Sequence, residues 1–215
     1  MPSELFQPQD YKRPPASGPG LYYDPVHGYI PLPPKIRRAI DLPSMERLRH
    51  VSQLSTVELV FPGATHNRLE HSIGVFHLTS MIIDTLTEKE REKAVRGQTH
   101  LALSPAARLA VQLAALFHDV GHGPYSHVFE LFCRRNPDYS HLDHHKATER
   151  LIAEGIGRYT DIPVFLRKVH EEVQHAPHIF PDWEKDVDLL LEDVQLALGV
   201  KAFFPWVSIW PRRRC

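Results

Sequence analysis

Histidine and aspartate are concentrated in one short stretch of this sequence. The run LFHDVGHGPYSH, residues 116–127, contains His118, Asp119, His122 and His127. A second histidine-bearing segment, HNRLEHS, lies upstream and includes His71. Neutral imidazole nitrogens and carboxylate oxygens are typical ligands of divalent metal ions. These two segments therefore predict a metal site.

The two segments are expected to lie where two buried helices meet. One predicted helix begins near Asn67 and carries an apolar stripe of His71, Val75, Leu78 and Ile82. The other carries a stripe of Leu109, Leu113, Leu116 and Phe117, and leads directly into His118 and Asp119. Packed helices lie about 8–10 Å apart, which brings such side chains within reach of one ion. A metal would also offset the cost of burying Asp119 unpaired. For His71 alone, a satisfied core histidine is the alternative interpretation.

The residues around this predicted metal site suit an anionic substrate. His122 and His127 lie among glycines and a proline, so the backbone there can approach a ligand closely. Histidine can donate to phosphate oxygens or move a proton near neutral pH. Arg68 precedes His71 by one helical turn, and a guanidinium beside a metal favours phosphate. A surface or salt-bridging arginine is the alternative interpretation of Arg68.

The composition excludes several other classes of protein. A chain of 215 residues suits one domain, and its 42% apolar and 24% charged residues are typical of a globular protein. A net charge of −1 gives no indication of nucleic-acid binding. Two cysteines, Cys133 and Cys215, favour a reducing compartment over a disulfide framework. Without a membrane-spanning run or a signal peptide, we expect a cytoplasmic protein.

The pattern of elements predicts a mainly α fold with a minor β-hairpin near the N-terminus. Residues 1–20 are rich in proline and polar residues and are expected to lack regular structure. The hairpin falls in LYYDPVHGYIPLPP, and VELVF at 57–61 is also β-like. Helices are expected to begin near Lys35, Pro43, Asn67 and Ser104, and to cover 145–153, 164–174 and 186–198. An aromatic and basic tail occupies 199–215.

Four motifs, in order along the chain, carry a resemblance to a known family. They are YDPVHGYIPL, IDLPSMERLRHVSQL, VFPGATHNRLEHSIGV and LFHDVGHGPYSHVFE. Together they resemble the HD-domain phosphohydrolases, most closely the deoxynucleoside triphosphate triphosphohydrolase branch. The resemblance is strong over 22–130 and fades after about residue 155. It implies an HD-domain helical bundle over 21–198. Two alternatives follow for its C-terminal side: the domain is shortened there, or a different carboxylate completes the site.

The resemblance also implies roles for individual residues. His71, His118 and Asp119 match ligands of one divalent ion, which could be Mn, Fe, Mg, Zn or Ni. His122 and His127 match histidines beside the triphosphate, and His127 matches the one that takes part in catalysis. Glu130 stands where the family often has an aspartate that supports this histidine. The remaining matches contact the nucleotide: Gln53 and Leu54 near the deoxyribose, Arg68, and His144, with His145 as another register.

The sequence departs from the family at its fourth metal ligand, an aspartate in an Arg-Asp context that is missing here. The candidates to replace it are Asp186, Asp188 and Asp193 on a late helix. Unless one of them does so, we expect low activity, since productive geometry tolerates only about 0.5 Å of error.

A second departure concerns regulation. Asp41 and Arg49 match positions that bind activating guanine nucleotides in regulated members of the family. However, Glu46 and Tyr23 replace the glutamine and asparagine expected beside them. This argues against nucleotide-activated regulation.

The favoured function is therefore a metal-dependent phosphohydrolase that converts a dNTP to a deoxynucleoside and triphosphate. The alternatives are a catalytically weak nucleotide-binding module, a nucleoside monophosphate phosphatase, and a phosphodiesterase, although the Gly-Tyr-Pro signature of that last branch is missing. The expected partners are a nucleotide substrate and, in a homo-oligomer, further copies of the chain. Neither a membrane nor a nucleic acid is indicated.

Overall fold

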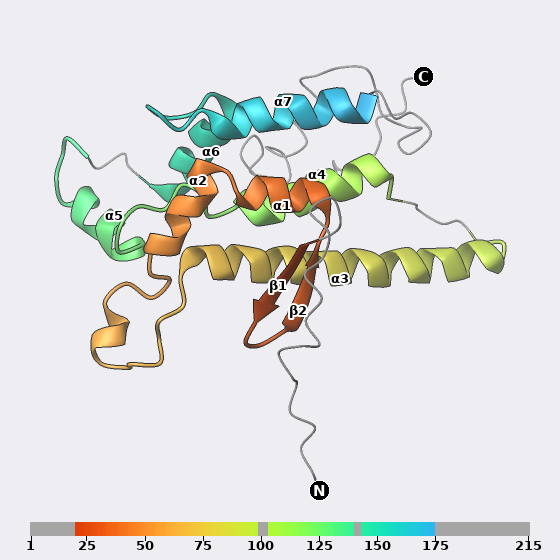
Figure 1. The fold of residues 1–215 in the computed structure, drawn as a ribbon, viewed down its shortest axis with the longest axis horizontal. Coiled ribbons are helices and arrows are strands. Elements are labelled where there is room, and N and C mark those ends of the chain that lie inside the picture. The colour runs from red at the N-terminus through yellow and green to blue at the C-terminus, as the bar shows by residue number, and fades with distance from the viewer. Residues whose placement is uncertain (1–19, 99–102, 140–142, 175–215) are drawn as a thin grey trace, which may run out of the picture.

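The computed structural model describes residues 20–98, 103–139 and 143–174. Over these residues the fold is mainly helical with one small antiparallel hairpin, which confirms the predicted fold class (Figure 1). The predicted irregular segment before residue 20, the helix at 186–198 and the tail at 199–215 lie outside the described residues. Within the described residues, no helix is both long and apolar enough to cross a membrane.

The hairpin consists of β1 (Gly20–Asp24) and β2 (Gly28–Leu32), with Tyr22 paired to Ile30. In the turn, the Asp24 carboxylate accepts hydrogen bonds from the backbone N–H groups of Val26 and His27, at 2.8 Å each. Gly28 closes the turn with a φ of 72°, a conformation that suits glycine. Ile30 and Leu32 then point into the core.

Prolines mark the beginnings of the next helices, as the sequence predicts. Helix α1 spans Pro34–Ile40 and α2 spans Pro43–Glu46, each with proline in the first turn, where its missing N–H costs nothing. A 3₁₀ turn, η2 (Arg47–His50), continues from α2.

The prediction of β structure at VELVF is wrong. The structure has a 3₁₀ turn there, η3 (Val57–Leu59), closed by local hydrogen bonds such as Val60 N–H to Val57 C=O at 3.0 Å. A strand gains stability only by pairing, and no described strand lies alongside. Pro62 and Gly63 then turn the chain within two residues, so the apolar side chains of this loop remain exposed.

The two longest helices, α3 (Arg68–Val95) and α4 (Pro105–Phe117), pack against each other and run antiparallel (Figure 1). Asn67 and Glu70 form a capping box that fixes the start of α3, with hydrogen bonds of 3.0 Å in both directions. Ser104 caps α4 by accepting from the Ala107 N–H. The start of α3 therefore lies beside the end of α4.

The predicted apolar stripe of α3 is wrong. The buried face carries Leu69, Ile73, Phe76 and Ile83, whereas Leu78 is 46% exposed and Ile82 is 59% exposed. Two apolar stripes run along this helix, and α4 covers only one of them. His71 consequently lies at the edge of the buried face and is only half-buried.

Three further helices complete the described fold: α5 (His127–Arg134), α6 (His144–Ala153) and α7 (Asp161–Gln174). The helices predicted near 145–153 and 164–174 are confirmed. Helix α7 packs on α6, α1 and α2. Its two ends are tied by polar contacts, from Asp161 to Ser44 and from Glu172 to Arg38. Buried apolar side chains from β2 and from helices α1–α4, α6 and α7 form one contiguous core.

Candidate active site

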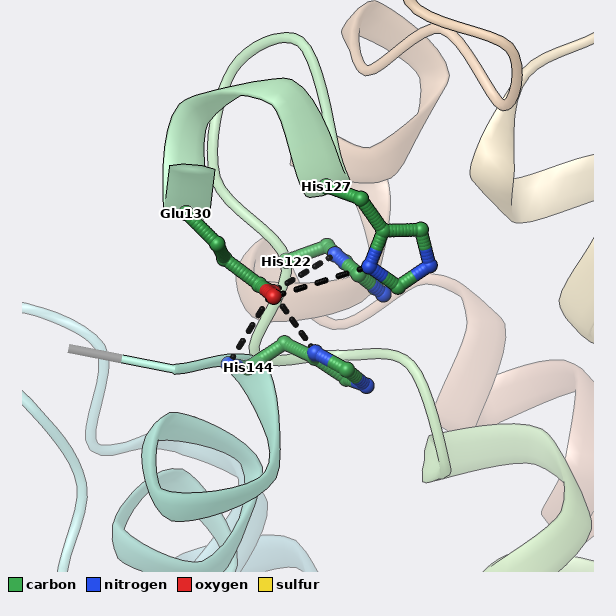
Figure 2. Close-up of side chains that lie close together, drawn as sticks. All are labelled: His122, His127, Glu130 and His144. Atoms are coloured by element: carbon green, nitrogen blue, oxygen red, sulfur yellow. Dashed lines mark hydrogen bonds and ion pairs between the residues drawn. The ribbon is translucent and has the colours of Figure 1, made fainter. Parts of the chain in front are cut away.

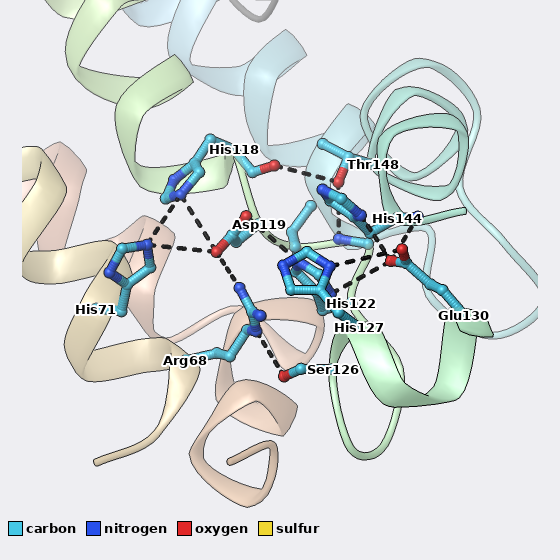
Figure 3. A network of polar contacts seen from close by, with 12 residues as sticks. Arg68, His71, His118, Asp119, His122, Ser126, His127, Glu130, His144 and Thr148 are labelled. Atoms are coloured by element: carbon cyan, nitrogen blue, oxygen red, sulfur yellow. Dashed lines mark hydrogen bonds and ion pairs between the residues drawn. The ribbon is translucent and has the colours of Figure 1, made fainter. Parts of the chain in front are cut away.

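Three ligand-type atoms form a triangle where α3 begins and α4 ends (Figure 3). The Nε2 atoms of His71 and His118 lie 3.2 Å apart, and they lie 3.4 and 3.3 Å from Asp119 Oδ2. Ligand atoms bound to one tetrahedral ion at roughly 2.0–2.1 Å lie about 3.3 Å from each other. This His–His–Asp triad therefore has the donor chemistry and the spacing of a divalent metal site.

Local structure orients the triad. His71 lies in the first turn of α3, and His118 is the C-cap of α4. The Nδ1 atom of His118 lies 2.8 Å from the carbonyl oxygen of Ala115. A hydrogen bond donated to that carbonyl leaves the Nε2 lone pair facing His71, as metal-binding histidines are commonly held.

Charge is balanced within the triad by a buried arginine. Arg68 is only 2% exposed; its Nη1 donates to Asp119 Oδ2, and its Nε donates to Ser126 Oγ at 2.8 Å. Burial acts to raise the pKa of Asp119, but the nearby His118 and Arg68 outweigh burial and hold it well below its usual range. Asp119 is therefore ionised and has the charge that a metal ligand needs. Arg68 is therefore a buried, salt-bridging arginine and not a surface one.

The pKa values of the two triad histidines are shifted in opposite directions. Burial lowers the pKa of His71, which keeps this imidazole neutral and able to bind an ion. Burial acts in the same direction on His118, but its hydrogen bond to Asp119 and the carboxylate charge outweigh burial, and the pKa is raised. A proton on His118 would compete with a metal, so metal affinity should fall as the pH is lowered.

A second group of ligand-type side chains lies next to the triad. It comprises His122, His127, Glu130 and His144, and we call it the histidine cluster (Figure 2). Glu130 Oε1 lies 2.6 Å from His144 Nδ1 and 3.7 Å from His122 Nδ1, while Oε2 lies 3.5 Å from His127 Nδ1. The carboxylate thus faces all three rings.

The two most enclosed rings of the histidine cluster, His122 and His144, have pKa values below the usual range, which favours their neutral forms. Burial and the Arg68 charge lower the pKa of His122 to about 3. Burial also lowers the pKa of His144, against the opposing effect of Glu130. His127 differs because its side chain is 63% exposed and can be reached from solvent.

The turn that joins the two groups is held by residues that the sequence did not identify. Arg47 donates to the carbonyl oxygens of Val120 and His122, the latter at 2.6 Å. The Gly121 N–H donates to Thr148 Oγ1 at 2.8 Å, which ties the turn to α6. Arginine and threonine in these contexts carry no sequence signal, because each acts on backbone atoms that only the fold brings close.

Backbone strain also marks this turn. Tyr125 and Ser126 have φ values of 58° and 51°, which are uncommon for residues with side chains and cluster at functional sites. Ser126 is buried, accepts from Arg68 and donates to the Ser52 carbonyl oxygen at 2.6 Å. These contacts hold the strained backbone against the start of α3.

The two residues predicted near a deoxyribose lie beside this turn. Gln53 follows Ser52, and its N–H donates to the His66 carbonyl oxygen at 3.1 Å. Its Oε1 atom is buried with no hydrogen-bond partner among the described residues. Leu54 is exposed. The candidate fourth ligands Asp186, Asp188 and Asp193 lie outside the described residues.

Comparison with known proteins places this arrangement in a family. The family model for the HD domain matches residues 68–197, which is more than half of the chain. The chain belongs to the HD domain family. Both the triad and the histidine cluster lie within the matched HD domain segment.

Individual relatives agree with this assignment. The chain is 46% identical over 110 residues to deoxynucleoside triphosphate triphosphohydrolase SAMHD1 of Danio rerio, covering 51% of this chain and 16% of that protein. It is 47% identical over 107 residues to the Homo sapiens protein of the same name, covering 50% and 16%. It is 35% identical over 133 residues to a putative HD domain-containing protein of Acanthamoeba polyphaga mimivirus, covering 60% and 29%.

These relatives confirm the predicted resemblance to the dNTPase-like branch of HD-domain proteins. The chain spans about a sixth of the length of the two vertebrate relatives.

Proposed function

We propose that this HD domain is a metal-dependent phosphohydrolase that acts on nucleotides, converting a dNTP to a deoxynucleoside and inorganic triphosphate. The observation that carries the proposal is the triad, in which two imidazole nitrogens and a carboxylate oxygen lie 3.2–3.4 Å from one another. The relatives whose names specify a deoxynucleoside triphosphate triphosphohydrolase support this choice of substrate.

The triad would hold one divalent ion. Its two nitrogens and one oxygen are compatible with Mn, Fe, Mg, Zn or Ni and do not select among them. When bound, such an ion polarises phosphoryl oxygens and activates water. Arg68 supports this centre by holding Asp119, and it adds positive charge near a bound phosphate. Because Arg68 is almost fully buried, it acts on the substrate through its charge rather than through an exposed contact.

The histidine cluster would bind the phosphates and transfer the proton. His127 is the proposed acid, because it is the exposed ring of the cluster and can reach the departing oxygen. Glu130 orients His127 from 3.5 Å. His144 would donate to phosphate oxygens from the start of α6. His122, whose side chain is only 1% exposed, would support His144 from the turn by stacking against its ring.

The deoxyribose would lie against the segment that carries Gln53 and Leu54. The exposed Leu54 offers an apolar contact for the sugar ring. The Oε1 atom of Gln53 is buried and has no hydrogen-bond partner among the described residues, so it would accept from a sugar hydroxyl after the side chain rotates toward the sugar. Both residues lie beside Ser52, whose carbonyl accepts from Ser126 near Arg68, so sugar and phosphates would be bound on neighbouring parts of the site.

The test is the metal dependence of nucleotide hydrolysis. The protein is stripped with a chelator, each divalent ion is added back singly, and phosphate-ester or anhydride cleavage is followed over a nucleotide panel. We expect activity to return with the ion in the parent and to stay absent in the His118→Ala/Asp119→Ala double variant. His50→Ala, an exposed histidine outside both groups, is the control and should behave as the parent. An ion-loaded parent that binds nucleotides without cleaving any of them would instead identify a binding module.

A further inference from the structure

We propose that Thr148 is a positioning residue for the triad, because its side-chain hydroxyl sets the backbone of the turn that carries His118 and Asp119. Thr148 lies just beyond the first turn of α6 and is only 2% exposed. Its Oγ1 atom contacts two backbone groups of the turn after α4 (Figure 3). The inference rests on the proposed function, since it takes the triad to hold a divalent ion. It goes further by assigning a role in metal affinity to a side chain outside both ligand groups.

The turn after α4 omits one of the hydrogen bonds that its pattern predicts. The bonds that form run from the Val120 N–H to the Phe117 carbonyl oxygen and from the His122 N–H to the Asp119 carbonyl oxygen, at 3.0 and 3.1 Å. Each joins residues three apart, as in a 3₁₀ turn. The same pattern would join the Gly121 N–H to the His118 carbonyl oxygen. Between these two backbone groups, however, no direct bond forms, and the Gly121 N–H is directed to α6 instead.

The Thr148 hydroxyl takes the place of the omitted bond. Its Oγ1 accepts from the Gly121 N–H at 2.8 Å and donates to the His118 carbonyl oxygen at 3.3 Å. A hydroxyl can do both at once, because it has one donor hydrogen and two acceptor lone pairs. The inserted oxygen therefore holds apart the first and fourth residues of the turn. Asp119, which supplies a triad oxygen, lies between them.

The ordinary roles of a threonine in a helix do not explain these contacts. Threonine commonly bonds back to a carbonyl three or four residues earlier, as Thr85 does with the Met81 carbonyl oxygen at 2.9 Å. Thr148 instead directs its hydroxyl to a different element. Filling space requires no hydroxyl either, because a buried valine would occupy a similar volume without a polar atom to satisfy. The two backbone groups that the hydroxyl joins are what explain it.

The close approach of α6 leaves the turn little freedom to adjust. A Cβ on Gly121 would lie 2.6 Å from Thr148 Oγ1, so this contact requires glycine. Arg47 fixes two further carbonyl oxygens of the same turn. Without the hydroxyl, the Gly121 N–H and the His118 carbonyl would be left unpaired or would close on each other. Either change moves His118 and Asp119, and a functional site tolerates only about 0.5 Å of error.

The experiment measures metal affinity on the full chain. Protein stripped with a chelator is titrated with Mn²⁺ alone, and the free ion is followed by its electron paramagnetic resonance signal. Binding that remains in His118→Ala/Asp119→Ala is subtracted as background. We expect Thr148→Val to raise the Kd of the ion about 10–100-fold, as is typical when a partner of a metal ligand is lost. Thr148→Ser keeps the hydroxyl and should have the Kd of the parent.

Thr85→Val provides the matched control. It is the same substitution at an exposed position of α3, where the hydroxyl bonds only within its own helix, and it should leave the Kd unchanged. Thr148→Ala removes the hydroxyl without adding a branched side chain and should weaken the ion as Thr148→Val does. The test therefore does not depend on the valine variant alone. Circular dichroism at the titration temperature confirms that each variant is folded.

A folded Thr148→Val or Thr148→Ala variant with the Kd of the parent would overturn the inference, even if its Tm were lowered. A Thr148→Ser variant that binds as weakly as Thr148→Val would also overturn it, and so would a parent that binds no Mn²⁺ above the background. The proposed function fails separately. A parent that binds Mn²⁺ but cleaves no nucleotide leaves the effect of Thr148 on the Kd standing, whereas turnover with an unchanged Kd in Thr148→Val removes only the role of Thr148.

Discussion

Gly121 allows α6 to approach the turn between the two ligand groups, and replacing it with alanine should separate them. A Cβ at this position would lie 2.2 Å from the carbonyl oxygen of His144 and 2.3 Å from the backbone nitrogen of Thr148. Both are backbone atoms in the first turns of α6, so neither can rotate away. Relieving the overlap requires α6 to retreat by about 1 Å, because well-packed interiors hold little free space.

The retreat of α6 would affect both stability and chemistry. Overpacking of this kind costs about 1–3 kcal/mol, which for a chain of this size lowers Tm by roughly 3–10 °C. His144 moves with α6 and loses its 2.6 Å contact with Glu130. A misplacement of about 1 Å near reacting groups lowers the rate roughly 10²-fold. We expect Gly121→Ala to show both losses, in thermal unfolding followed by circular dichroism and in nucleotide hydrolysis.

Gly74→Ala provides the matched control. It lies within α3, and a Cβ there would meet no atom within 4 Å. Because alanine favours helix over glycine by about 1 kcal/mol, this variant should be slightly more stable than the parent and equally active. A Gly121→Ala variant with the Tm and the rate of the parent would refute the packing argument.

Three further variants test the electrostatics and capping. Arg68→Ala leaves Asp119 without its buried cation and should cost about 3–5 kcal/mol of unfolding free energy in metal-free protein, and less when an ion is added, as measured by denaturant melts with and without the ion. Glu172→Gln should lose under about 1 kcal/mol at neutral pH, because this carboxylate is partly exposed. The Arg38 hydrogen bond and nearby positive charge lower the pKa of Glu172 to about 2. The contribution of Glu172 to the free energy of unfolding is therefore present above about pH 4.5 and disappears as the pH falls toward 2. Urea melts across that range should show the stabilities of the parent and the variant converging. Asn67→Ala breaks the capping box of α3 and should cost about 1 kcal/mol in the same melts.

Much of the fold and the convergence of the triad could be predicted from local sequence signals. Pro34, Pro43 and the Ser104-Pro105 pair begin helices for reasons that act within one turn. Once the two helices pack antiparallel, the start of α3 lies beside the end of α4, and His71 meets His118. Short-range chemistry was sufficient for the helix starts, and the packing of two apolar helices added the convergence of the triad.

Other features depend on contacts between distant parts of the chain. Helix α3 has two apolar stripes, and only its packing against other elements decides that Ile73 is buried while Ile82 is exposed. Likewise, the loop at Val57 has β-forming residues but no strand to pair with. The roles of Arg47 and Thr148 involve backbone atoms more than 25 residues away, and no local pattern encodes them.

The central claim is tested most directly by the products of dNTP hydrolysis. Protein loaded with its divalent ion is incubated with a single dNTP, and the products are separated by ion-exchange and reversed-phase chromatography. We expect deoxynucleoside and inorganic triphosphate in equal amounts from the parent, and neither product from His118→Ala/Asp119→Ala. Release of deoxynucleoside monophosphate and pyrophosphate by the parent would contradict the proposed cleavage position. Release of deoxynucleoside and triphosphate by the double variant would contradict the role of the triad.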